Sequence, residues 1–148
     1  MKVTMLLADA AQAVGGKLYV LGGGWSLTGP APTPMAIAIK IDLPWDRSNM
    51  KHHFRLELVD SDGHPVKVPL EPDGEPEPLL VDGEFETGRP PGLKPGTPLD
   101  VPLAFNFGPV PLQPNKRYEW RFSFREYPEE EWSASFSTRS ALPTGMAG

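Results

Sequence analysis

The stretch "RYEWRFSFRE" (Arg117–Glu126) alternates apolar and polar side chains without a break. Successive side chains of a β-strand leave it on opposite faces, so one face of this stretch would be aromatic and the other charged or polar. The aromatic face would consist of Tyr118, Trp120, Phe122 and Phe124. The stretch therefore predicts a β-strand with one buried face and one face in water.

The segment after this stretch continues the same pattern. "WSASFST" (Trp132–Thr138) alternates apolar residues with Ser and Thr, and the acidic "EYPEEE" (Glu126–Glu131) separates it from the first strand. Two strands joined by a short polar connection form an antiparallel hairpin. We expect a six-residue acidic loop at its tip. Glu129–Glu131 would be solvated there, and their charges would disfavour edge-to-edge pairing of the hairpin with another chain.

Period-two alternation recurs along the rest of the chain and gives about eight or nine short strands in all. The other strands are expected around Val3–Leu7, Leu18–Val20, Ile37–Ile41, Phe54–Leu58, Val66–Leu70, Leu79–Phe85 and Leu99–Phe107. In the third of these the isoleucines would face inward and Ala38 outward. Pro69 and Pro102 fall inside strands, so these strands should lie at sheet edges or carry bulges, because proline has no N–H to donate.

Many short strands with turn-rich connectors indicate an all-β fold. We expect a single antiparallel β-sandwich over residues 1–139, immunoglobulin-like in the loose sense, because a second sheet is the simplest cover for a buried face. Residues 140–148 are expected to form a flexible tail. Only Asp9–Val14 could form a helical turn, with Asp9 as its N-cap.

Composition restricts the environment and the partners. The 148 residues fit one domain, and the absence of cysteine is consistent with a reducing compartment, so we expect a cytoplasmic protein. The net charge of −5 argues against nucleic acid as a partner. No stretch approaches the ~18 apolar residues of a membrane span, and Val3–Ala8 is shorter than the core of a signal peptide, so no membrane partner is expected.

The glycines of "AVGGKLYVLGGGW" (Ala13–Trp25) do not form a phosphate-binding motif. A P-loop requires glycine where Ala11 stands and Ser or Thr where Leu18 stands. We therefore expect Gly15 and Gly16 to be turn residues with positive φ, and we expect no cofactor.

The candidate metal ligands also fit simpler interpretations. "DSDG" (Asp60–Gly63) begins like a calcium loop, but Pro65 stands where such a loop requires glycine, so a tight turn is expected. His52 and His53 are adjacent on a strand and would face opposite sides, so they would not share one metal. With His64, they are expected to be surface or strand-end residues. No metal site and no catalytic residue are predicted.

Five residues form a possible interaction surface: Trp25, Trp45, Arg117, Arg121 and Arg125. The tryptophans lie near loops, and aromatic side chains anchor interfaces. The three arginines share one wet strand face and would suit a carboxylate or phosphate partner. The alternatives are that the tryptophans belong to the core and that the arginines are simply solvated among acidic and serine neighbours.

The pattern "AD…GGKLYVLGGGW" resembles the N-terminus of an uncharacterised family of small bacterial all-β proteins. The matching positions are Ala8, Asp9, Gly16, Lys17, Leu18, Gly22 and Gly23. At the other end, "LQPNKRYEWRFSF" resembles the closing strands of immunoglobulin-like sandwiches. The resemblance implies a fold and no known activity, so it transfers no catalytic residue.

These observations favour a non-catalytic protein interaction or assembly module that binds an unknown protein or forms a homo-oligomer. The alternative is a binder of a small ligand or carbohydrate, with a concave site lined by Trp25 or Trp45. A third hypothesis is an enzyme of unrecognised type, in which His, Asp or Glu converge in a pocket with shifted pKa values.

Overall fold

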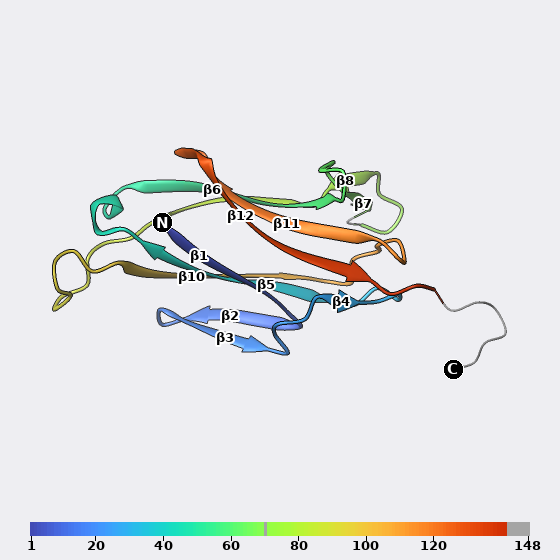
Figure 1. Cartoon of the computed structure of the whole chain (residues 1–148), viewed down its shortest axis with the longest axis horizontal. Helices are drawn as coiled ribbons and strands as arrows, with labels where there is room; N and C mark the ends of the chain where they lie inside the picture. The colour runs from blue at the N-terminus through green and yellow to red at the C-terminus, as the bar shows by residue number, and fades with distance from the viewer. Residues whose placement is uncertain (70, 142–148) are drawn as a thin grey trace.

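The computed structural model describes residues 1–69 and 71–141, and it is all-β (Figure 1). Leu70 and residues 142–148, which include most of the expected tail, lie outside the described residues. The described residues form twelve strands and one short 3-10 turn, η1 (Trp45–Arg47), and contain no α-helix. The strands are β1 (Lys2–Ala8), β2 (Ala10–Val14), β3 (Lys17–Leu21), β4 (Leu27–Thr28), β5 (Met35–Leu43), β6 (Lys51–Asp60), β7 (Lys67–Pro69), β8 (Pro76–Pro78), β9 (Leu80–Glu86), β10 (Leu99–Phe107), β11 (Arg117–Phe124) and β12 (Tyr127–Thr138).

Four sheets organise these strands. The larger two have the orders β1-β5-β10 and β4-β12-β11-β6-β9, and the smaller two are the pairs β2-β3 and β7-β8. All pairings are antiparallel except that of β4 with β12, which is parallel. In Figure 1 the three-stranded sheet lies between the five-stranded sheet and the β2-β3 hairpin.

The two larger sheets share one hydrophobic core. Ile37, Ile39 and Ile41 of β5 are fully buried in it, as are Trp120 and Phe122 of β11. Aromatic rings join the sheets directly, because the ring of Phe107 stacks on that of Trp120 at 5.0 Å between centroids. The predicted burial of the Tyr118–Phe124 face is therefore confirmed.

A second, smaller core lies on the opposite face of the three-stranded sheet. It consists of four buried alanines, with Leu18 and Ala104 packed at its edge: Ala8, Ala11, Ala36 and Ala38. Alanine side chains are short, so the backbone of the β2-β3 hairpin lies close to the sheet that it covers. Ala38 does face outward from the main core, as predicted, but the hairpin covers it.

Three strands were not expected from the sequence. They are β2, β4 and β8, and they bring nine expected strands to twelve. The helical turn predicted at Asp9–Val14 is wrong, because Ala10–Val14 pairs with Lys17–Leu21 as strand β2. Contacts with β3 and the alanine core outweigh the helix propensity of three alanines.

The expected six-residue acidic loop is also wrong. The chain turns at Arg125 and Glu126, and β12 begins at Tyr127, which pairs with Phe124. A register shift between Ser123 and Phe124 accommodates the extra residues of β12. The prolines behave as predicted, since Pro69 lies in a two-stranded sheet and Pro102 lies in β10, the last strand of its sheet.

Candidate functional site

The β2-β3 hairpin carries apolar side chains on both of its faces. The face toward the sheet contains the cross-strand pairs Ala11–Val20 and Ala13–Leu18. The opposite face contains the pairs Ala10–Leu21, Gln12–Tyr19 and Val14–Lys17. A strand with one wet face normally places polar residues there, so the large apolar residues among Gln12 and Lys17 on this outer face are unusual.

Five large exposed apolar side chains belong to the hairpin or to the neighbouring strand β1. On the outer face, Leu21 is 71% exposed, and Val14 and Tyr19 are each 56% exposed. On the side toward the sheet, Val20 of β3 and Leu6 of β1 are 39% and 38% exposed. We call these five residues the hairpin patch; only two other large apolar side chains of the described residues, Leu27 and Met50, are comparably exposed.

Leu6 joins the patch through its contact with β3. A Cβ atom built on Gly23 would meet Val20 Cγ1 at 2.7 Å and Leu6 Cδ2 at 2.9 Å, so the two side chains converge above this glycine. Leu6 points away from the main core, because its neighbours Met5 and Leu7 pack into that core. The patch thus extends from the hairpin onto β1.

The glycine pair makes the turn of the hairpin. Gly15 has φ +58° and Gly16 has φ +76°, as in the two-residue turns that match the twist of paired strands. No atom beyond their neighbours lies within 4 Å of a Cβ built on either residue. The prediction that both are turn residues with positive φ is confirmed.

The two edges of the hairpin differ. The side chain of Asn106 in β10 caps the edge of β2: the Ala11 N–H donates to Asn106 Oδ1 at 3.1 Å, and Asn106 Nδ2 donates to the Ala11 carbonyl at 2.8 Å. Within the described residues, β3 pairs with β2 alone. Because hydrogen-bonded and non-bonded pairs alternate from the turn, the N–H and C=O groups of Leu18 and Val20 point away from β2.

The two tryptophans of the predicted interaction surface lie in different environments. The half-buried Trp25 packs edge-on against Phe136, with 5.9 Å between ring centroids, and its buried indole N–H has no partner among the described residues. Trp45 lies in η1 under the guanidinium of Arg89, which is 4.0 Å from the ring centroid. It lines an open hollow of about 530 Å³ together with Pro44 and Pro98.

The three arginines occupy the outer face of β11 and its end. Arg121 Nε donates to Glu119 Oε2 at 2.6 Å and lies 3.7 Å from a Glu131 carboxylate oxygen. The hydrogen bond from Arg121 lowers the pKa of Glu119. Arg117 and Arg125 are exposed. The middle arginine is therefore engaged by carboxylates on its own sheet, and a role of the row in binding remains a prediction.

The sequence predicts His52 as a surface or strand-end residue; it is the second residue of β6, but it does not lie at the surface. It is fully buried, because it shares the inward face of β6 with Phe54. Its Nε2 lies 2.8 Å from the Arg47 carbonyl and its Nδ1 lies 3.3 Å from the Tyr127 hydroxyl, so both ring nitrogens have partners. This is a packed and satisfied core histidine.

His53 lies on the opposite face of β6, as predicted. Its Nδ1 is 2.6 Å from Glu126 Oε2, and its Nε2 is 3.0 Å from Glu84. Its backbone N–H donates to the other oxygen of Glu126 at 2.7 Å. Burial opposes ionisation of Glu126, but the hydrogen bonds from His53 outweigh it and lower the pKa of this carboxyl.

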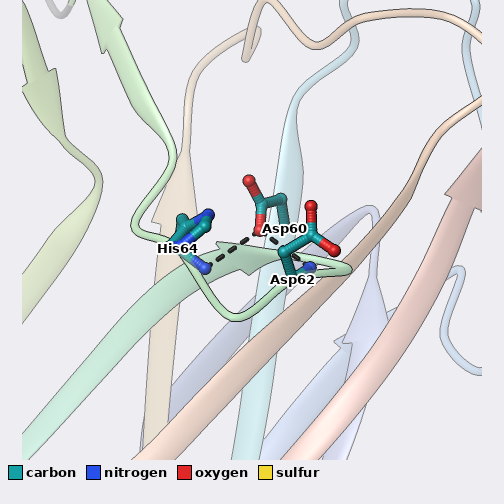
Figure 2. Close-up of side chains that lie close together, drawn as sticks. All are labelled: Asp60, Asp62 and His64. Carbon is teal, nitrogen blue, oxygen red and sulfur yellow. Dashed lines mark hydrogen bonds between the residues drawn. The ribbon is translucent and has the colours of Figure 1, made fainter.

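Figure 2 shows the turn after β6, where Asp60, Asp62 and His64 each offer one possible ligand atom, all within 4.8 Å of one another. Asp60 Oδ1 accepts hydrogen bonds from the backbone N–H groups of His64 at 2.9 Å and Asp62 at 3.0 Å. The bond from His64, aided by that from Asp62, lowers the pKa of Asp60. The predicted tight turn is confirmed, and its closure accounts for the cluster.

No helix in the described part of the chain is long and apolar enough to cross a bilayer. A protein-family model described as "Family of unknown function (DUF6941)" matches residues 3–136. The match spans β1 to β12 and includes the whole hairpin patch. A search of curated proteins finds no match.

Proposed function

The chain belongs to DUF6941, a family of unknown function, and from this premise we propose that it is a non-catalytic protein-interaction module whose contact surface is the hairpin patch. The observation that carries this proposal is the outer face of the β2-β3 hairpin, where Val14, Tyr19 and Leu21 are all exposed. Burying such side chains is favourable by roughly 25 cal/mol per Å² of apolar area. A partner that covers the face supplies this burial.

The composition of the patch supports protein binding. Contiguous apolar patches on a folded chain often mark contact sites, and tyrosine is enriched among the residues that dominate interface energies. The hairpin residues 10–21 contain no Asp or Glu, although the chain has 19 acidic residues. An interface core is characteristically depleted of charge in this way.

The strand order supports an immunoglobulin-like sandwich as the frame that presents the patch. In chain order, β1-β5-β10 corresponds to strands A-B-E, and β12-β11-β6-β9 corresponds to G-F-C-C′. In this interpretation β2 and β3 are an insertion between the first two strands of the frame. An insertion that the frame does not need for its own core is available for binding.

The experiment compares two double variants with the unmodified protein. Tyr19→Ser with Leu21→Ser removes the centre of the patch, and Leu27→Ser with Met50→Ser removes the other two large exposed apolar side chains of the described residues. Each tagged protein is used to capture partners from extracts of its native cell and, separately, a second copy of itself carrying another tag. We expect a stoichiometric partner, foreign or self, with the unmodified protein and the control only.

Retention of every partner by the Tyr19→Ser, Leu21→Ser protein would overturn the proposal, provided that circular dichroism shows it folded. Equal loss of the partner with both double variants would also overturn it, because the loss would then result from making the surface more polar anywhere on the protein.

A second candidate is binding of a small ligand beside Trp45. The hollow of about 530 Å³ lined by Trp45, Pro44 and Pro98 favours it. Arg89 already covers one face of the Trp45 ring, so a ligand there would contact the ring edge or displace the guanidinium. A co-purifying small molecule that is lost from the Trp45→Ala variant would support this function over the first.

A further inference from the structure

We propose that the partner is a second copy of this chain, joined along the β3 rim of the hairpin patch by antiparallel pairing of β3 with β3 of the other copy about a two-fold axis at Tyr19. This inference rests on the proposed function and adds the identity of the partner. A two-fold interface brings the same surface of both copies together, so that surface must complement itself. The backbone edge of β3 and the charge distribution of the hairpin both meet this requirement.

The open edge of β3 is self-complementary in its hydrogen-bonding groups. The outward N–H and C=O groups belong to Leu18 and Val20, one residue to each side of Tyr19. In the two-fold arrangement Leu18 faces Val20 of the second copy and exchanges both hydrogen bonds with it. The same exchange on the other side of the axis satisfies the remaining outward groups.

Pairing also brings the two tyrosines together. Tyr19 faces itself across the axis as a non-hydrogen-bonded pair, the type in which opposite side chains are closest. Aromatic pairs of this kind contribute about 0.5–1.5 kcal/mol beyond their buried area. Leu6 and Val20, which are left half-exposed along the open edge, lie where the added strand would cover them.

The charge distribution favours this face over the rest of the surface. Two copies with a net charge of −5 repel, but the only charged residue of the hairpin is Lys17. In the proposed register Lys17 lies opposite Leu21 of the second copy. The strand rise and interstrand spacing then separate the two lysines by roughly 14 Å, beyond the ~8 Å screening length at physiological salt.

The assembly should stop at two chains. Asn106 occupies the outward groups of Ala11 on β2 and leaves those of Ala13 alone, so the other edge of the hairpin lacks the pair of open residues that β3 offers. An isologous contact with one free edge closes on itself, whereas two free edges would propagate.

Cross-linking tests the register directly, because the natural chain has no cysteine. Tyr19→Cys places one thiol on the proposed axis, within the Cα separation that a disulfide requires. Leu27→Cys places one thiol on an exposed residue outside the patch. Under mild oxidation we expect at least tenfold faster formation of the disulfide-linked dimer from Tyr19→Cys. Equal rates would overturn the register.

A second pair of variants tests the backbone pairing without relying on the tyrosine. Val20→Pro and Val20→Ala both shorten the side chain, but only proline removes the outward N–H, which β2 does not use. Sedimentation over a concentration series should show dimers for the unmodified protein, at least tenfold weaker association for Val20→Pro than for Val20→Ala, and no larger species. Equal association of the two variants would overturn edge pairing.

This inference and the proposed function fail separately. If the unmodified protein sediments as a monomer at about 100 µM, yet captures a foreign protein that the Tyr19→Ser, Leu21→Ser variant does not, the second copy is wrong and the proposed function stands. If it is monomeric and captures nothing through the patch, both are wrong.

Discussion

The β2-β3 and β11-β12 hairpins are built on the same principle but differ on their outer faces. Both pack an apolar face inward, against the alanine core and the main core respectively. On the outer face of β11, Glu119 and Arg121 are joined by a hydrogen-bonded ion pair. On the outer face of β2-β3, the corresponding positions carry exposed Val14, Tyr19 and Leu21.

The two hairpins also differ in how firmly they are held. Strand β11 has hydrogen-bonded neighbours on both sides, β12 and β6, whereas β3 has only β2 among the described residues. Large aromatic side chains fix β11, whereas alanines and the side chain of Asn106 hold β2 to its sheet. Small contact areas give low local stability, so the β11-β12 hairpin belongs to the frame and the β2-β3 hairpin can open separately.

The largest expected effect comes from replacing one aromatic residue by alanine in each of the two hairpins. Trp120→Ala should lower the free energy of unfolding by about 3–5 kcal/mol, because it leaves a large cavity in the main core. Tyr19→Ala should change it by less than about 0.5 kcal/mol in the monomer, because the side chain is exposed. Urea unfolding at low protein concentration measures both. Comparable losses would mean that the hairpin patch belongs to the core of the monomer.

The fold could be predicted wherever each strand alone shows which face is buried. The aromatic row of β11 and the isoleucines of β5 alternate with polar or small residues, and the structure buries both sets. The burial of His52 was missed because a surface or strand-end histidine was expected, although His52 is in phase with Phe54 on β6. The phase of the strand was the better guide than the residue type.

The candidate site could not be predicted from the same rule. Alternation identifies the buried face of a strand. In "KLYVL" (Lys17–Leu21), however, four successive positions are apolar, so the pattern does not say which face is buried. The alanine-rich Ala10–Val14 resembled a helical turn until its pairing with β3 was seen. The hairpin forms a third layer through contacts between residues far apart in the sequence, and the four successive apolar residues Leu18–Leu21 were its only local signal.

The attachment of the β2-β3 hairpin gives a smaller expected effect. Asn106→Ala should cost roughly 1–2 kcal/mol, because it removes both hydrogen bonds to the backbone of Ala11. The loss should be local, so hydrogen exchange should accelerate in residues 10–21 while β11 keeps its protection. Gln12→Ala, which removes an exposed amide from the same hairpin, is the control. Uniform acceleration in both hairpins would contradict the idea that the β2-β3 hairpin opens by itself.

The smallest effect should distinguish the two hairpin turns by their response to acid. Glycines form the β2-β3 turn, whereas Glu126 in the β11-β12 turn accepts hydrogen bonds from the backbone and ring of His53. Burial opposes the ionisation of Glu126, but these bonds lower its pKa below the ordinary 4.5 of a glutamate. Its stabilising contribution is therefore complete above that ordinary value and is lost as the pH falls through the lower pKa of the folded state.

Glu126→Gln should therefore cost about 1 kcal/mol or less at pH 7 and progressively less below pH 4.5, where the natural carboxyl is also neutralised. The measurement is the urea midpoint of both proteins from pH 7 to pH 3, with Glu129→Gln as an exposed control on β12. The urea midpoints of Glu126→Gln and the wild type should converge in acid, whereas the midpoints of the Glu129→Gln control should follow the wild type throughout. A constant gap down to pH 3 would show that the ionised carboxylate of Glu126 does not hold this turn.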